Sequence, residues 1–246
     1  RGAVTIDEER DYHFRYVLED NFGNRRTYQF IVKGKRQDIP EYKPEANEML
    51  YWNQANVIQK PGMELVVPRY YVYEDVPLRT DMRGDSSRIA FDYILDAGRT
   101  PIHSYCDLSI GLRHMPVADT TKYYIVQKAG KWRSSMGGKY ASGWIKTRVR
   151  SLGTFSVDVD TIAPQITPIG QGGWRTSRNI RFRIKDMESG IGSYKVYIDG
   201  KFVLFGLKKG ILVIQDPEKV KKGVPHKLEV TVTDQCGNMA RKEYKF

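Results

Sequence analysis

Four histidines are the residues of this chain best suited to metal or acid–base chemistry. They are His13, His103, His114 and His226, and no two of them form a His-x-His pair. His103 and Asp107 have the His-x-x-x-Asp spacing, but a catalytic zinc needs three protein ligands and an open position. Only His114 could approach as a third ligand. We therefore expect His103 and Asp107 to be exposed polar residues on one strand, and we predict no metal in this chain.

Other catalytic patterns are missing from the sequence. It contains no Gly-rich phosphate loop, no nucleophile elbow and no Cys-x-x-Cys pair. Its two cysteines, Cys106 and Cys236, fall in different predicted domains, so no disulfide framework follows. Nothing distinguishes the carboxylate pair Glu74-Asp75 from charges on a solvated loop, so the sequence gives glycosidase activity no support. We predict a non-enzyme without a cofactor, and an enzyme of unrecognised type stays an alternative.

A loop with aromatic rings among cations and glycines is the best candidate for binding. Trp132 is flanked by Lys131 and Arg133, and Tyr140 and Trp144 follow it. Aromatic faces stack on sugar rings, while Lys and Arg suit carboxylates, so a cell-wall glycan is a candidate ligand. The alternative is that Tyr140 and Trp144 anchor the core of a long hairpin.

The chain is basic, with a formal net charge of +11. Arg181 and Arg183 alternate with apolar residues and predict a basic strand face, which would suit an anionic polymer or would simply be solvated. No helix-turn-helix or RNA-recognition pattern appears, so we expect no nucleic-acid partner. No run of eighteen apolar residues predicts a membrane span.

The elements that must carry these residues are strands. The signature Asp-x-x-Gly-Asn occurs at residues 20–24 and 234–238, each copy between runs that alternate apolar and polar residues. Gly and Asn accept the positive φ of tight β loops, so both copies predict hairpins. Asp and Asn side chains cap such turns, and we assign this role to five residues: Asp20, Asn24, Asp186, Asp234 and Asn238. Calcium binding is the rival interpretation, but each loop offers only two or three oxygens.

The predicted fold is all-β, with tandem β-sandwich modules. Residues 1–38 read as the terminal hairpin of a truncated module, because a lone hairpin is marginal in water. Proline-spaced residues 39–44 predict a linker. Residues 39–160 form a middle β domain, and residues 161–246 carry six or seven short strands, the rhythm of an immunoglobulin-like sandwich. The chain begins with Arg1, from which we expect a tail cut from a longer protein.

Several motifs give the chain a family resemblance. In the last block they are Asp160-Thr161-Ile162-Ala163-Pro164, Asp186-x-x-Ser189-Gly190-Ile191 and Asp234-x-x-Gly237-Asn238; in the middle block they are Pro61-Gly62-Met63-Glu64-Leu65, Tyr73-Glu74-Asp75 and Gly137-Gly138-Lys139-Tyr140-x-x-Gly143-Trp144. Together they resemble the C-terminal immunoglobulin-like region of secreted lysostaphin-type zinc peptidases of Bacteroidota.

The resemblance implies a role beside an enzyme. The family binds zinc through a His-x-x-x-Asp segment and a His-x-His pair, and the second of these is missing here. The zinc-binding catalytic domain would then lie upstream in the same polypeptide. The protein would be located in the periplasm, in the cell envelope or outside the cell. This chain would be a non-catalytic accessory region that positions the peptidase or contacts cell-wall material. A stand-alone carbohydrate-binding or adhesion module is the alternative.

Overall fold

The computed structural model describes residues 4–36, 45–85, 87–98 and 100–246. In these residues nearly all regular structure is β-strand, which confirms the all-β prediction. The chain divides into two units, residues 1–43 and 44–246. The predicted linker at residues 39–44 lies outside the described residues.

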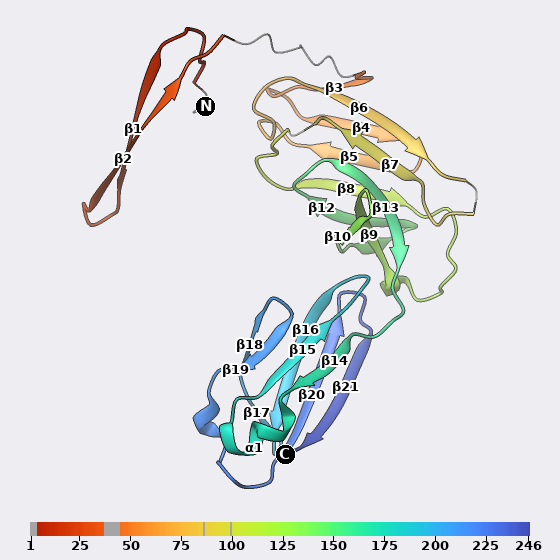
Figure 1. Cartoon of the computed structure of the whole chain (residues 1–246). Coiled ribbons are helices and arrows are strands. Elements are labelled where there is room, and N and C mark those ends of the chain that lie inside the picture. Colours follow the sequence, from red (N-terminus) through yellow and green to blue (C-terminus); the bar gives the residue numbers. More distant parts are fainter. Residues whose placement is uncertain (1–3, 37–44, 86, 99) are drawn as a thin grey trace. The chain divides into compact units, whose positions relative to one another are not determined.

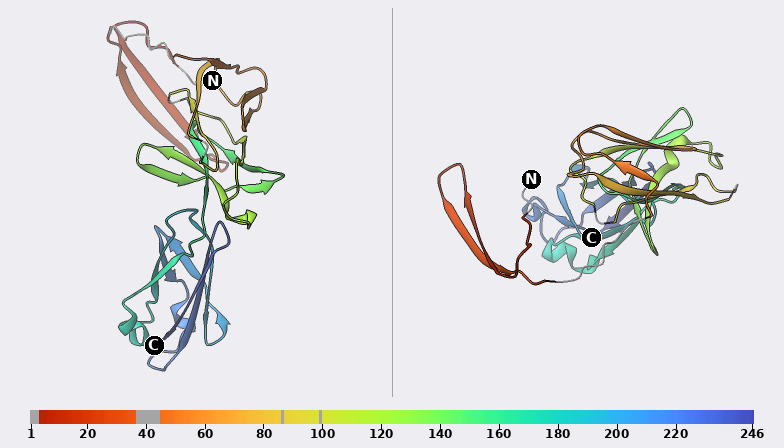
Figure 2. Two further views of the ribbon diagram at one scale, coloured as in Figure 1. Left: turned by 90° about the vertical axis from the view of Figure 1, so that its right-hand side faces the viewer. Right: turned by 90° about the horizontal axis from the view of Figure 1, so that it is seen from above.

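The first unit is one long antiparallel hairpin. Its strands are β1 Asp11–Glu19 and β2 Arg25–Lys33, and their register places Phe14 opposite Phe30. Figure 2 shows the two strands as a twisted ribbon, and no third described strand pairs with either of them. Each strand therefore keeps one edge without a β partner among the described residues.

The second unit begins with the middle domain, residues 45–160, whose strands form two antiparallel sheets. One sheet has the order β10-β9-β13-β7-β6-β3 and the other β11-β12-β8-β5-β4 (Figure 1). The strands are β3 Glu48–Leu50, β4 Asn56–Lys60, β5 Met63–Val67, β6 Val76–Arg83, β7 Asp92–Asp96, β8 Cys106–Gly111, β9 Tyr123–Ala129, β10 Trp132–Ser135, β11 Lys139–Ala141, β12 Trp144–Val149 and β13 Gly153–Val159.

Alternating residues of these strands build one core. Met63, Leu65 and Val67 on β5 are buried, while the residues between them are only half-buried, as a strand with one face on a core requires. Tyr93, Tyr123 and Phe155 are its largest buried rings. A short 3₁₀ turn, Thr120–Lys122, leads into β9.

The last domain, residues 161–246, is a second pair of four-stranded sheets with its own core. Their orders are β14-β15-β19-β18 and β17-β16-β20-β21. The strands are β14 Gln165–Ile169, β15 Arg181–Lys185, β16 Ile191–Ile198, β17 Lys201–Phe202, β18 Phe205–Lys208, β19 Ile211–Ile214, β20 Lys227–Asp234 and β21 Met239–Lys245. Fully buried Trp174 contacts Phe182 and Tyr244 edge-on, so one indole joins the two sheets.

Local details differ from the prediction. The helix α1, Trp174–Ser177, and the 3₁₀ turns Gln171–Gly173 and Pro217–Lys219 were not predicted, since four residues are too few to show helical periodicity. The strand expected to carry both His103 and Asp107 begins only at Cys106 and ends at Gly111. His103 therefore lies in the preceding loop and not on the strand, which corrects its predicted setting.

Candidate functional site

The first Asp-x-x-Gly-Asn turn is closed by its own aspartate. Asp20 Oδ1 accepts the backbone N–H groups of Phe22 and Asn24, both at 2.9 Å. Asp20 Oδ2 accepts the Asn24 side-chain amide at 2.8 Å. Gly23 has φ +82°, a left-handed conformation that glycine adopts without a Cβ penalty.

The second turn repeats this geometry. Asp234 Oδ1 accepts the N–H groups of Cys236 and Asn238 at 2.8 Å, and Asp234 Oδ2 accepts the Asn238 amide at 2.8 Å. Gly237 has φ +80°. The two turns are thus equivalent in bonding as well as in sequence.

Their surroundings shift the pKa values of Asp20 and Asp234 in opposite directions. Hydrogen bonds from the Asn24 side chain and backbone lower the pKa of exposed Asp20. Burial raises the pKa of Asp234, and the nearby charge of Asp160 adds to this effect, against the hydrogen bonds from Asn238 that lower it. Position in the fold, and not the motif, decides the sign of the shift.

Asp234 belongs to an acidic triad, which we define as Asp160, Asp186 and Asp234. Their oxygens lie within 4.8 Å of one another, and these are the described residues whose carboxylates could together face a metal ion. Protein donors already engage each of them. Asp160 accepts from the Ser189 N–H and hydroxyl, and Asp186 accepts the Gly190 N–H at 2.7 Å. The predicted turn-capping residue Asp186 therefore closes its own loop.

The triad lies where the last domain meets the middle domain. Asn238 Nδ2 also donates to the backbone oxygen of Asp160 at 3.0 Å, which ties the terminal hairpin of the last domain to the last residue of the middle domain. Lys122 Nζ donates to the Cys236 carbonyl at 3.0 Å, and the Tyr124 hydroxyl donates to Glu188 at 3.2 Å. Residues of β9 and of the turn before it thus bond directly to the last domain.

Apolar contacts complete this junction. Tyr124 and Val126 on β9 form a small buried cluster with Cys236. Burial raises the pKa of the Tyr124 hydroxyl, and it raises the pKa of the Cys236 thiol to about 11. Cys236 is therefore a protonated, inert thiol at neutral pH, and its role is packing.

Trp132 is the most exposed of the three predicted aromatic binding residues. It opens β10 beside the hairpin tip, and 81 % of its surface is accessible. The ring cannot be a core anchor in this position. The adjacent Arg133 forms an ion pair with Asp158 on β13, so one of its flanking cations is held in place.

Tyr140 and Trp144 lie on the other sheet of the middle domain, on the paired strands β11 and β12. Tyr140 is about one-third exposed. Trp144 is half-buried over Gly111, where an added Cβ would lie 3.6 Å from the indole ring. They and Trp132 therefore do not share a sheet.

Arg181 and Arg183 lie on β15 of the last domain and are exposed, whereas Phe182 between them is buried. Their strand is in the interior of its sheet, between β14 and β19. They form a basic row on the outer face of the last domain, in a different domain from the aromatic candidates.

His103 and Asp107 belong to no group of three metal-ligating side chains in the described part of the chain. His103 Nδ1 lies 3.0 Å from the Tyr73 hydroxyl, and its ring meets Tyr71 and Tyr73 edge-on. Asp107 is exposed on β8, opposite Arg148 of β12. The imidazole thus has a structural partner in the tyrosine.

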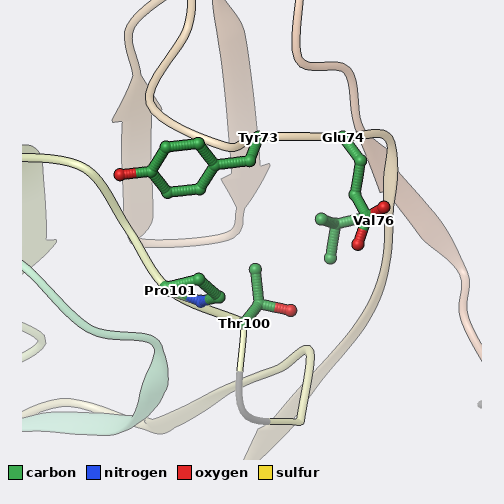
Figure 3. A pocket seen from close by; sticks show the side chains of 5 residues that line it. All are labelled: Tyr73, Glu74, Val76, Thr100 and Pro101. Atoms are coloured by element: carbon green, nitrogen blue, oxygen red, sulfur yellow. The ribbon is translucent and has the colours of Figure 1, made fainter. Parts of the chain in front are cut away.

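A shallow hollow beside this histidine was not predicted. It holds about 280 Å³ and is lined by Tyr73, Glu74, Val76, Thr100 and Pro101. Figure 3 shows the Tyr73 and Pro101 rings toward one end and Glu74 and Val76 toward the other. An aromatic face beside a carboxylate is a combination that binds sugars or amines.

The sequence carried only a weak signal for this hollow. Its two lining segments are about 25 residues apart and belong to two loops, which the His103 N–H joins by a hydrogen bond of 2.8 Å to the Tyr71 carbonyl. The tyrosines at positions 70, 71 and 73 were the one visible hint, since such clustering is uncommon in a loop without a packing role.

Comparison with known families gives one match. Residues 47–160 match the family described as a Zu5-like domain, which corresponds to the middle domain. The match does not extend to the last domain, and so it does not bear on the resemblance to a peptidase-associated region. A search of curated proteins found no match to the chain.

No helix in the described part of the chain has the length and apolar character needed to cross a membrane.

Proposed function

We propose that this chain is a non-catalytic accessory region of a cell-envelope peptidoglycan metallopeptidase, in which it contacts cell-wall material and helps to position the catalytic domain. The exposure of Trp132 is the observation that carries the contact role. Holding an indole in water forfeits the stabilisation that burial would give, roughly 1.5–3 kcal/mol for a large apolar side chain. A ligand that covered this ring would recover that stabilisation.

The surroundings of Trp132 suit a glycan with acidic groups. Its exposed face is free for a sugar ring, and the neighbouring Lys131 supplies positive charge, while the guanidinium of Arg133 is already paired with Asp158. The β9–β10 pairing places Trp132 opposite Ala129, so the indole stands on a hairpin with a fixed register. A backbone already held in a strand loses little conformational entropy on binding.

The bonded junction supports the positioning role. A spacer transmits position only if its joints are held, and Lys122, Tyr124 and Asn238 each hydrogen-bond across this one. Both domains therefore contribute side chains to the junction. A ligand held at Trp132 would be kept in register with the last domain.

The remaining parts of the proposal follow from the resemblance. The partner is an upstream peptidase domain, and the location is the periplasm, the cell envelope or the extracellular space. Zinc belongs to the absent catalytic domain. This chain is proposed to need no cofactor and to bind no nucleic acid.

The test is retention of the purified chain on peptidoglycan sacculi. We expect Trp132→Ala to weaken binding about tenfold, which corresponds to about 1.4 kcal/mol, and Trp132→Phe to restore part of it. The control is Phe202→Ala, which removes a 60 % exposed ring from the last domain and should leave retention unchanged. Unchanged retention of Trp132→Ala would remove the contact role.

A stand-alone carbohydrate-binding or adhesion module is the second candidate, and the hollow at Tyr73 favours it. Loss of glycan binding in Tyr73→Ala, with Trp132→Ala unaffected, would select this function. The full-length gene separates the two as well, since a peptidase accessory region requires His-x-x-x-Asp and His-x-His segments upstream. Lysis of peptidoglycan by this chain alone in a zymogram would show that it is an enzyme after all.

A further inference from the structure

The hairpin β1–β2 has the same register as the terminal hairpin of the last domain. His13 pairs with Ile31 in the first, and Lys227 pairs with Lys245 in the second. His13 lies 214 positions before Lys227, and Ile31 lies 214 positions before Lys245. Together with the matching turns, this makes β1 the equivalent of β20 and β2 the equivalent of β21.

In the last domain this hairpin has a covered inner face. Leu228, Val230 and Val232 on β20 are completely buried. On β21, Tyr244 lies with its ring centroid 5.8 Å from Trp174 and 5.4 Å from Phe182, which belong to the opposite layer.

The equivalent face of the first hairpin is aromatic and, apart from half-buried Phe14 and Val32, exposed. Its residues are Phe14, Tyr16 and Leu18 on β1 and Tyr28, Phe30 and Val32 on β2. Phe30, the counterpart of Tyr244, stacks at 5.2 Å on Phe14 within the hairpin and remains 47 % exposed. Tyr16 and Leu18, the counterparts of Val230 and Val232, are more than half exposed.

The edge of β1 is open as well. In the last domain the other edge of β20 pairs with β16, which places Val196 opposite Val230 and Tyr194 opposite Val232. Among the described residues β1 pairs with β2 alone. An open β edge beside an apolar face is complementary to a further strand and a second sheet.

We propose that β1–β2 is the closing hairpin of a second sandwich, completed by a segment equivalent to residues 165–214 of the last domain and preceding the hairpin in the same polypeptide. That segment adds a strand to β1 as β16 adds to β20, and it lays an aromatic layer over Phe30 as Trp174 and Phe182 do over Tyr244. The same polypeptide is the source because β14 to β19 precede β20 in the last domain, and the chain order of the repeat places their equivalents before β1. This inference does not depend on the proposed function.

The two faces of the hairpin provide a matched pair of variants. Phe30 lies on the inner face and Ile31 on the outer one, and their exposures are close, 47 % and 53 %. Phe30→Lys places a charge on the covered face, while Ile31→Lys places the same charge on the face whose last-domain counterpart, Lys245, is exposed. Phe30→Lys also removes the stacking of Phe30 on Phe14, so its local effect on the hairpin is measured separately, in the 246-residue chain.

The experiment is hydrogen exchange of peptides from residues 11–33, in the 246-residue chain and in the full-length polypeptide expressed from its own gene. We expect exchange in β1 to be at least about 100-fold slower in the full-length protein, because opening the strand then requires opening the sandwich. Phe30→Lys should restore fast exchange there, while Ile31→Lys should not. In the 246-residue chain, where β1 should already exchange fast, the two variants should differ far less than in the full-length protein.

The wild-type comparison keeps the proposal testable even if Phe30→Lys fails to fold. Equal exchange of β1 in the two wild-type proteins would overturn it, and so would equal sensitivity to the two substitutions. Light scattering of the 246-residue chain should give a monomer; a dimer that Phe30→Lys dissociates would show that a second copy is the occupant instead. Phe30-dependent sedimentation with phosphatidylglycerol vesicles would likewise overturn it in favour of a lipid surface.

Discussion

Asn238 and Asn24 occupy the same position in two equivalent turns, and replacing each by alanine separates the contribution of the motif from that of its surroundings. Asn238→Ala removes two side-chain hydrogen bonds, to the Asp234 carboxylate at 2.8 Å and to the Asp160 carbonyl at 3.0 Å. Asp234 is 4 % exposed and Asp160 is fully buried. Water therefore cannot easily replace either bond.

The magnitude follows from these two losses. A hydrogen bond to a charged group contributes about 1.5–3 kcal/mol, and a buried carbonyl left without its donor costs about 1–3 kcal/mol. We expect Asn238→Ala to lower the free energy of unfolding by about 3 kcal/mol, or at least ~6 °C in Tm for a unit of this size. Asn24→Ala removes one bond, to exposed Asp20, and should change stability by no more than about 0.5 kcal/mol.

The assay is chemical denaturation of the 246-residue chain, with hydrogen exchange to locate the loosened segment. Protection should fall in β14, β20 and β21, the strands next to the junction. Asn238→Asp should be worse than Asn238→Ala, since it adds a carboxylate to the acidic triad. A loss below about 1 kcal/mol for Asn238→Ala, or an equal loss for Asn24→Ala, would refute the reasoning.

Two further predictions concern charge and backbone. In a ¹³C NMR titration of the side-chain carboxyls, Asp234 should titrate above the usual range of aspartate and Asp20 below it; coinciding midpoints would contradict the assigned causes. Because the folded-state pKa of Asp234 is raised, its contribution to stability is fully present below the unfolded pKa and is lost as pH rises through the folded pKa, whereas that of Asp20 is lost as pH falls through its folded pKa. Gly138→Ala should lower stability by about 2–4 kcal/mol, since φ is +137° and the new Cβ would lie 2.6 Å from Ile145 Cγ2. Gly143→Ala, at φ +86° with open space around it, should cost only about 1 kcal/mol, and a similar loss for both variants in thermal unfolding would argue against the clash.

The strand content of this fold was predictable because its signal is local. Alternation along β5 and β15 and the Asp-x-x-Gly-Asn turns specify strands and hairpins without reference to the rest of the chain. Short elements such as α1 were not predictable, because the packing of Trp174 against both sheets holds its four residues in place.

The candidate sites were predictable only where one residue stands alone. Trp132 could be singled out because its neighbours in sequence are also its neighbours in space. The junction could not, since Asn238 meets Asp160 across 78 positions and Lys122 meets Cys236 across 114. The hollow at Tyr73 likewise depends on the contact of two loops, which no local pattern encodes.

The bond between Asn238 and Asp160 can form only late in synthesis, because Asn238 is made 78 residues after Asp160. Domains generally fold from the N-terminus as the chain leaves the ribosome, so the middle domain can complete its sheets while the last hairpin has not yet been made. Lys122 and Tyr124 are then already in place on β9 and the turn before it. The last domain can complete its fold only when Asn238 has been made and can bond to Asp160. It therefore folds against a middle domain that is already folded, and the contacts at Lys122 and Tyr124 orient the last domain as it forms.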